Sequence, residues 1–388
     1  MEKKSAVKSP TEDKITSRSQ GEGDIGVEPE PFRKALLQWF DDHRRQLPWR
    51  GVDDPYAVWV SEVMLQQTRV ATVIDYFERW MERFPTVQEL AGAEVDEVLE
   101  MWSGLGYYRR ARFLHRAAVE VVEEYDAIVP ERVSELKKLP GIGPYTAGAI
   151  ASIAFGRVEP VVDGNVMRVV TRLEAIDGDP RRGAAKKNIW SCAADWVDRR
   201  RPGDFNQGLM ELGSQVCTAR APKCDDCPVR RWCRARRQGR PERYPTGSRK
   251  TTQRPMRGRC CVVHCDDGAG ERRFLLRRRD DTGLLAGLWE FPSCEKQGEA
   301  MPPVETLEAS ICDVLSVASQ GAMSPKLGEV THVFSHRRLE MGVHELRLCK
   351  APAGELPQRW RWVDAADLDD VASAALLQKI HRLWSAHR

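Results

Sequence analysis

Apolar residues recur at helical spacing through residues 31–237, and this pattern predicts a helical domain. A first amphipathic segment covers residues 31–40 and stops at the Leu47-Pro-Trp-Arg50 break. The longest pattern runs from Tyr56 to Trp80, with apolar side chains near i, i+3, i+4 and i+7 spacing. Shorter helices are predicted over residues 87–91, 95–101, 111–125 and 145–155, and over a segment that ends near Leu173.

The pattern changes after Gly258, where short apolar runs bounded by polar residues predict β-strands. One helix is expected over residues 304–317, and another closes the chain. This second region, residues 258–388, is therefore expected to be an α+β domain. The strands are predicted over residues 260–265, 273–278, 327–334, 339–348 and 360–363.

Two segments lack periodicity and lie outside these domains. Residues 1–30 are polar and charged, which predicts a disordered tail. Residues 238–257 are rich in Arg, Pro, Gly, Ser and Thr and predict a linker. A chain of 388 residues is longer than one core usually serves, so two domains agree with its size.

Composition excludes some classes and leaves others open. No apolar run approaches membrane-spanning length, and the N-terminus lacks a signal-peptide core, so a cytosolic, nucleoid or organellar protein is expected. A net charge of +3 does not indicate a nucleic-acid binder by itself. Two compact basic runs, residues 109–116 and 230–237, interleave arginines with aromatics. Each is either a solvated face or a phosphate contact.

Two glycine turns stand between predicted helices. In Leu139-Pro-Gly-Ile-Gly-Pro-Tyr-Thr-Ala-Gly-Ala-Ile150, Gly141 and Gly143 allow a tight turn that leaves free N–H groups at a helix start. These groups suit a phosphate backbone read by shape, although a plain helix corner has the same pattern. In Trp102-Ser-Gly-Leu-Gly-Tyr-Tyr108, the aromatics either pack in a corner or wedge between bases.

Two carboxylates occur in unlike settings. Glu62, in Ser61-Glu-Val-Met-Leu-Gln-Gln-Thr68, lies one residue from an apolar stripe, and the ordinary interpretation is a solvated contact with Gln66. Asp163 precedes an apolar helix, and either Asp163 or Asn165 is expected to cap it. Helix-start amides would also keep Asp163 ionised by lowering its pKa.

Four of the eleven cysteines are regularly spaced, and the compartment argues against disulfides. Cys217, Cys224, Cys227 and Cys233 are separated by 6, 2 and 5 residues. Four thiolates in so short a segment suit one metal centre. Their chemistry alone does not separate zinc from a four-iron cluster. His264 and Cys265 are either a second metal site or idle side chains.

Together these motifs resemble the MutY family of adenine DNA glycosylases over residues 31–388. The resemblance implies an all-α helix–hairpin–helix domain whose cysteine loop, similar to that of endonuclease III-like glycosylases, holds a [4Fe–4S] cluster. It implies a Nudix-like C-terminal domain that reads oxidised guanine. No Arg-Glu-x-x-Glu-Glu helix follows Gly287, so we expect recognition without pyrophosphatase activity. The motifs are Leu-Pro-Trp-Arg50, residues 61–68, Gly104–Tyr108, the hairpin, Val162-Asp-Gly-Asn165, the cysteine loop and Phe334-Ser-His336.

The family implies a function in base excision repair: removal of adenine paired with 8-oxoguanine or guanine by a monomer acting on duplex DNA, without a membrane. Glu62 would be the acid and Asp163 its ionised partner, supported by Tyr145 and Asn165. The enzyme would be cytoplasmic and nucleoid-associated in a bacterium, and nuclear or organellar in a eukaryote. The implied DNA contacts are Arg50, Leu65, Gln67, Thr68, Leu105, Tyr107, Gly141, Gly143, Phe334, Ser335 and His336.

Three other interpretations have counter-evidence in the same residues. An endonuclease III-like pyrimidine glycosylase with lyase activity would carry a Schiff-base lysine where this chain has Tyr145. A non-catalytic DNA-binding protein would not need both Glu62 and Asp163. A zinc protein with packed glycine turns remains the chemical alternative for the four cysteines.

Overall fold

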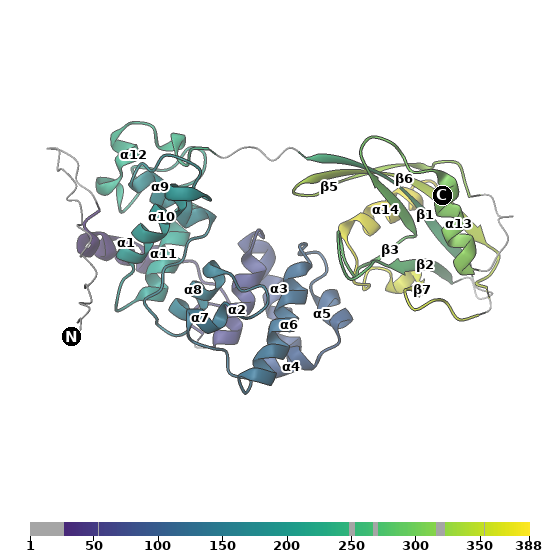
Figure 1. The fold of residues 1–388 in the computed structure, drawn as a ribbon, viewed down its shortest axis with the longest axis horizontal. Helices are drawn as coiled ribbons and strands as arrows, with labels where there is room; N and C mark the ends of the chain where they lie inside the picture. Colours follow the sequence, from purple (N-terminus) through teal and green to yellow (C-terminus); the bar gives the residue numbers. More distant parts are fainter. Residues whose placement is uncertain (1–26, 53, 248–252, 267–270, 316–322, 353) are drawn as a thin grey trace, which may run out of the picture.

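The computed structural model describes residues 27–52, 54–247, 253–266, 271–315, 323–352 and 354–388. Within them a helical region and a sheet region follow one another along the chain (Figure 1). The predicted tail lies outside the described residues except at its end, where α1 begins at Pro29. The predicted linker is shorter than expected, because η2 occupies Pro241–Arg243, Tyr244 is buried, and β1 begins at Arg254.

The helical region consists of two lobes with separate apolar cores. Helices α2 to α8 contribute to one core, and α1, α9, α10 and α11 contribute to the other. The bounds are α1 (Pro29–His43), α2 (Pro55–Leu65), α3 (Val70–Arg83), α4 (Val87–Gly92), α5 (Val95–Met101), α6 (Arg109–Glu124), α7 (Val133–Leu136), α8 (Pro144–Ile153), α9 (Gly164–Leu173), α10 (Gly183–Trp196), α11 (Pro202–Gln215), η1 (Arg230–Trp232) and α12 (Arg234–Arg237).

The single helix predicted from Tyr56 to Trp80 is wrong. The chain leaves the helix after Leu65 and begins α3 at Val70. Gln67 between them has a φ of 59°, a left-handed conformation that no helix interior accommodates. Helices α10 and α11 were not predicted, and α11 proves to line the candidate site.

Helix α2 is buried on all sides, which decides the setting of Glu62. Every residue from Tyr56 to Met64 is buried. A helix enclosed in this way is an interior element rather than a surface amphipathic one. The solvated setting considered for Glu62 is therefore wrong.

The C-terminal region is a seven-stranded mixed sheet with a helix on each face. Strands β3-β2-β1-β6-β5 form the main path, β4 also pairs with β1, and β7 also pairs with β2. Among the described strand pairs, β1–β6 alone is parallel, from Arg254↔Arg337 to Cys265↔Leu348. The bounds are β1 (Arg254–Asp266), β2 (Arg272–Arg278), β3 (Trp289–Glu290), β4 (Ser293–Gln297), α13 (Val304–Leu315), β5 (Gly328–Val333), β6 (Arg337–Leu348), β7 (Trp360–Asp364), η3 (Ala365–Asp367) and α14 (Ala375–Ser385).

Alternation along β1 assigns its side chains to the two faces. Cys261 and Val263 share a core with α13, whereas Cys260 and Val262 share one with α14. This is the period of two that a strand requires. Both faces of the sheet are thus covered, as expected for an α+β domain.

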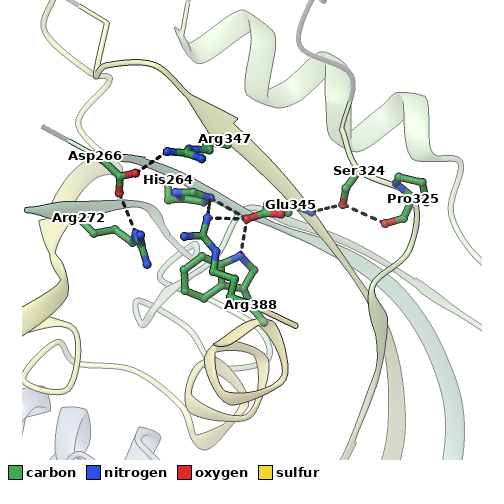
Figure 2. Close-up of polar contacts among 9 residues, drawn as sticks. His264, Asp266, Arg272, Ser324, Pro325, Glu345, Arg347 and Arg388 are labelled. Carbon is green, nitrogen blue, oxygen red and sulfur yellow. Dashed lines mark hydrogen bonds and ion pairs between the residues drawn. The ribbon is translucent and has the colours of Figure 1, made fainter. Parts of the chain in front are cut away.

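A partly buried polar cluster ties α14 to the sheet (Figure 2). Glu345 Oε1 accepts from Trp384 Nε1 at 2.9 Å and lies 2.8 Å from His264 Nε2 and 2.9 Å from Arg388 Nη2. Burial would raise the pKa of Glu345, but the hydrogen bonds from Arg388, His264 and Trp384 outweigh it and lower this pKa to about 2. His264 therefore serves a structural ion-pair cluster rather than the second metal site considered above.

Candidate active site

A cavity of about 150 Å³ opens between the two helical lobes. Its walls come from α2, α8, α11, the start of α9 and the segment before α2. Seven predicted site residues line it together: Arg50, Glu62, Leu65, Thr68, Tyr145, Asp163 and Asn165.

Glu62 is the most perturbed carboxyl group in this cavity. Its exposed fraction is 5%. Burial raises the pKa of Glu62 to about 7, the nearby Asp163 charge raises it further, and the Tyr145 hydrogen bond and Arg50 oppose the rise. Tyr145 Oη donates to Glu62 Oε2. A carboxyl group with this pKa is protonated often enough near neutral pH to act as a general acid.

Asp163 faces the same cavity from the start of α9. Its Oδ1 accepts from the Val166 backbone N–H at 2.6 Å, and its Oδ2 accepts from Asn165 Nδ2 at 2.8 Å. The predicted cap is thus present. The predicted lowering of its pKa is wrong, because burial raises the pKa of Asp163 more than the hydrogen bonds from Val166 and Asn165 lower it.

Asn165 also links Asp163 to the cysteine loop. Its Oδ1 accepts from Arg168 Nη2 at 2.9 Å, and Arg168 Nε donates to the Cys217 carbonyl at 2.7 Å. Arg168 further donates to the Gly213 carbonyl at 2.6 Å. The orientation of Asn165 is therefore fixed through Arg168, which is itself held by the carbonyls of Gly213 and Cys217.

A buried carboxylate that the sequence analysis missed holds Arg50 in place. Glu211, with an exposed fraction of 1%, accepts from Arg50 Nη2 at 2.7 Å and from Arg45 Nε at 2.6 Å. Burial would raise the pKa of Glu211, but its hydrogen bonds with Arg45 and Arg50 lower it. The sequence did carry a signal for α11, the helix on which Glu211 lies. This signal is the helical spacing of the apolar side chains Phe205, Leu209, Leu212 and Val216.

The four regularly spaced cysteines line a second, smaller cavity of about 20 Å³. Among the residues described by the structure, no group of three or more His, Cys, Asp or Glu side chains could hold a metal ion. Zinc needs sulfurs about 2.3 Å from one ion. Four cysteine thiols that line one cavity can hold either a zinc ion or an iron–sulfur cluster, because each is held by four cysteines. Buried Arg172 donates to Cys217 Sγ at 3.4 Å and to the Thr218 carbonyl at 2.6 Å, which shapes this ring.

Two exposed side chains project from strained turns, of which the first borders the cavity through Thr68. Gln67 and Tyr107 are exposed, and their φ angles are 59° and 50°. Non-glycine residues in this conformation cluster at functional sites. Leu105, predicted to contact DNA, is instead buried in the core.

The hairpin turn has the geometry expected from its glycines. Gly141 has a φ of 77°, and a Cβ there would lie 2.6 Å from Phe113 Cβ. Gly143 is the N-cap of α8 and provides no side-chain cap. The turn therefore presents backbone N–H groups at a helix start, where anions bind.

The C-terminal domain contacts the helical region, in part through the loop at residues 334–336. Ser335 and His336 are exposed and Phe334 is half-buried. Tyr107 Oη lies 2.6 Å from Ser335 Oγ. Tyr108 Oη donates to the Ser373 carbonyl at 2.5 Å, and Arg278 pairs with Asp96 at 2.5 Å.

The basic run at residues 109–116 is largely turned inward. Arg110 donates to backbone carbonyls of α2, and Arg112 packs against Gly287 and pairs with Asp281 at 3.8 Å. Arg109 and Arg116 are exposed. Only part of this run is thus available for phosphate contact.

Comparisons with known proteins agree with this arrangement. Residues 60–194 match the HhH-GPD superfamily base excision DNA repair protein, residues 217–233 the iron-sulfur binding domain of endonuclease III, and residues 260–383 the NUDIX domain. The predictions of a helical domain with an iron–sulfur cofactor and of a Nudix-like domain are thereby confirmed. Within the described residues no helix is both long and apolar enough to cross a membrane.

Individual relatives extend over most of the chain. The adenine DNA glycosylase of Mus musculus is 41% identical over 411 residues, which cover 92% of this chain and 78% of that protein. The adenine DNA glycosylase of Schizosaccharomyces pombe is 36% identical and covers 92% and 90% respectively. Among solved structures, a thermostable thymine-DNA glycosylase is 28% identical with a TM-score of 0.50 and covers 53% of this chain and 95% of that one.

Proposed function

Because this chain belongs to the adenine DNA glycosylase family, we propose that its cavity accepts an adenine flipped out of duplex DNA and that its C-terminal domain selects adenines paired with 8-oxoguanine or guanine. One observation carries the proposal. Glu62 and Asp163 share the cavity but have different hydrogen-bond partners. Such a pair of carboxyl groups serves acid-assisted glycoside hydrolysis.

Adenine leaves poorly as an anion, so it must be protonated as it departs. The carboxyl group of Glu62, with a pKa of about 7, supplies a proton to N7. The proton moves from the Glu62 oxygen to the base, and the electrons of the glycosidic bond leave with the neutral purine. Tyr145 Oη stays hydrogen-bonded to the resulting Glu62 carboxylate.

Departure of the base leaves a cation-like sugar that requires a nearby negative charge. Asp163 supplies it from the start of α9, held in orientation by Val166 and Asn165. Its carboxylate stabilises the cation electrostatically or captures it covalently until water adds. Glu62, now ionised, can accept the proton that this water loses.

The substrate nucleotide reaches the cavity only after leaving the base stack. Unstacking costs a few kcal/mol and costs least at a mispair. Gln67 and Tyr107 are exposed on their turns, and we propose that they occupy the space that the adenine vacates. The Gly141–Gly143 turn would hold the phosphate backbone through its N–H groups.

The choice of the opposite base rests on Ser335. It is exposed, it lies 2.6 Å from Tyr107, and it belongs to the Nudix-like domain. A hydroxyl group can both donate to and accept from the edge of an oxidised purine. His336, also exposed, and half-buried Phe334 would flank the same base.

The iron–sulfur cluster has a supporting position in this proposal. Cys217, Cys224, Cys227 and Cys233 would be its ligands. The bound cluster supplies structural support, and the Arg168–Asn165 contacts would transmit that support to Asp163.

The reaction would stop at base removal. The described residues that line the cavity include no lysine, and Tyr145 occupies the position of the Schiff-base nucleophile. One chain contributes every proposed residue, so we propose a monomer. It would act on genomic DNA, in the nucleoid of a bacterium or in the nucleus or an organelle of a eukaryote.

Single-turnover excision on four duplexes tests the function. Each duplex carries adenine opposite 8-oxoguanine, guanine, cytosine or thymine. We expect the largest rate constant opposite 8-oxoguanine, a smaller one opposite guanine, and little cleavage of the other two. Equal rates on all four duplexes, or release of a pyrimidine in place of adenine, would overturn the proposal.

A further inference from the structure

Arg110 on α6 connects the two turns that carry Gln67 and Tyr107. Its Nη1 donates to the carbonyls of Val63, Met64 and Gln66 at 2.7, 2.9 and 2.8 Å. Its Nη2 donates to Thr68 Oγ1 at 3.2 Å on the same turn, and to the carbonyls of Leu105 and Gly106 at 3.2 and 3.0 Å on the other. One guanidinium group thus holds both turns.

The partners of this guanidinium are neutral. Among the described residues, no carboxylate lies within ion-pair distance of Arg110. Instead, three of its acceptors are carbonyls at the C-terminal end of α2, which carry the negative end of the helix dipole. Glu62 lies in this same last turn of α2. The cation therefore caps the helix that positions the proposed acid.

The turns on either side are strained and would not keep their shape alone. Gln67 and Tyr107 both have left-handed backbones, with φ angles of 59° and 50°. Such conformations persist only where the surroundings enforce them. Arg110 binds the neighbours of both residues, and its guanidinium lies 5.6 Å from the Tyr107 ring.

We propose that Arg110 is a positioning residue that fixes Gln67 and Tyr107 as one two-pronged wedge, so that both side chains enter the duplex at a set spacing around the mispair. This inference rests on the proposed function, because it concerns how the same site engages DNA. A lysine cannot replace this arginine, since one ammonium group lacks the planar fork that reaches both turns. The charge alone is therefore insufficient.

The first test is Arg110→Lys, with Arg83→Lys as the matched control. Arg83 is an exposed arginine of the same lobe that pairs with Glu97. We expect Arg110→Lys to lower the ratio of affinities for mispaired over fully matched duplex by tenfold or more, with matched-duplex affinity within threefold of wild type. Arg83→Lys should retain both values. An unchanged ratio in folded Arg110→Lys would overturn the proposal.

The second test reports on the wedge without catalysis and without Arg110 substitution. The Thr68 amide donates to the Leu65 carbonyl at 3.3 Å, and the Leu105 amide donates to the Trp102 carbonyl at 3.1 Å, so hydrogen exchange can monitor each turn. Thr68→Val removes one Arg110 contact on the first turn. We expect exchange at Leu105, on the other turn, to accelerate severalfold while amides in α10 stay unchanged.

Exchange at Leu105 that is unaffected by Thr68→Val would show that the turns are independent and would overturn the proposal. A wild-type chain that excises no adenine would overturn the proposed function instead. In that case the exchange experiment would still decide whether Arg110 couples the two turns.

Discussion

Tyr107 Oη lies 2.6 Å from Ser335 Oγ, although 228 positions separate the two residues in the chain. Tyr107 belongs to the glycine turn of the helical domain, and Ser335 belongs to the loop between β5 and β6. Both are among the DNA contacts that the family resemblance implies. The contact places Ser335, which is proposed to recognise the opposite base, beside Tyr107, which is proposed to enter the base stack. Both side chains can therefore approach the same base.

Replacing Glu62 by Gln tests the acid. The amide keeps the shape of the side chain but supplies no proton, so we expect the excision rate constant to fall about a thousandfold or more. Binding to the mispaired duplex should stay within threefold, because the cavity keeps its volume. Single-turnover kinetics and a binding titration on the same duplex measure both. Full activity in this variant would contradict the mechanism.

The rate of excision should depend on pH through Glu62. Its protonated form is the reactive one, so the rate constant should fall as pH rises through about 7. The Tyr145 hydrogen bond lowers this pKa. In Tyr145→Phe the alkaline limb should therefore move to higher pH. A limb that moves to lower pH, or no limb in the wild type, would show that another group donates the proton.

The same pKa predicts a cost in stability at alkaline pH. Because the folded-state pKa of Glu62 is raised to about 7, the native protein binds the proton more tightly than the unfolded chain. The contribution of this proton to the free energy of unfolding is thus fully present below the pKa of Glu62 in the unfolded chain, and it is lost as pH rises through about 7. Glu62→Gln does not titrate, so we expect its free energy of unfolding to exceed that of wild type by about 1–3 kcal/mol near pH 8 and by less near pH 5. Urea denaturation at both pH values measures the difference, and an equal difference would contradict it.

Ser335→Ala should weaken the choice of the opposite base. We expect excision opposite 8-oxoguanine to slow about fivefold to tenfold, as the loss of one hydrogen bond to a base implies, with little change opposite guanine. The Tyr107 contact is lost as well, so Tyr107→Phe is the companion variant that separates the two effects. Ser385→Ala, at an exposed position on α14, serves as the control. Equal slowing on both duplexes would mean that Ser335 acts through general binding.

Metal analysis of anaerobically purified protein tests the cysteine ring. We expect about four irons per chain, no stoichiometric zinc, and a broad visible absorption band that acid bleaches. Cys227→Ala should lose iron and unfold at lower temperature. Stoichiometric zinc in active protein would contradict the assignment of the cluster.

The parts of the fold that follow from local pattern were predictable from the sequence. The apolar periodicity predicted α4, α5 and α6 within about two residues. The sequence narrowed the cap of α9 to Asp163 or Asn165, and the structure shows Asp163. Strand β1 was predicted too short, since its first residues are polar and gain their place only by pairing with β6. Pairing of that kind leaves no local trace.

The break between α2 and α3 was not predictable, for a physical reason. Gln66 to Arg69 carry no proline or glycine, and the apolar spacing continues across them. The turn is held by Arg110, a residue on another helix that the basic run at 109–116 suggested was exposed. Likewise, the position of Arg50 depends on Glu211, which lies 161 positions away. Such long-range charge partners are decided by tertiary packing.

The cavity lies between two separately packed cores, and this division has a consequence for how the enzyme fails. Glu62 belongs to the lobe of α2, whereas Asp163 belongs to the lobe of α9. Neither lobe therefore contains both of the carboxyl groups that the reaction requires. A substitution that loosens the contact between the two lobes, even far from any reacting atom, should abolish activity while each lobe stays folded. The turnover rate therefore reports whether the two lobes are correctly positioned.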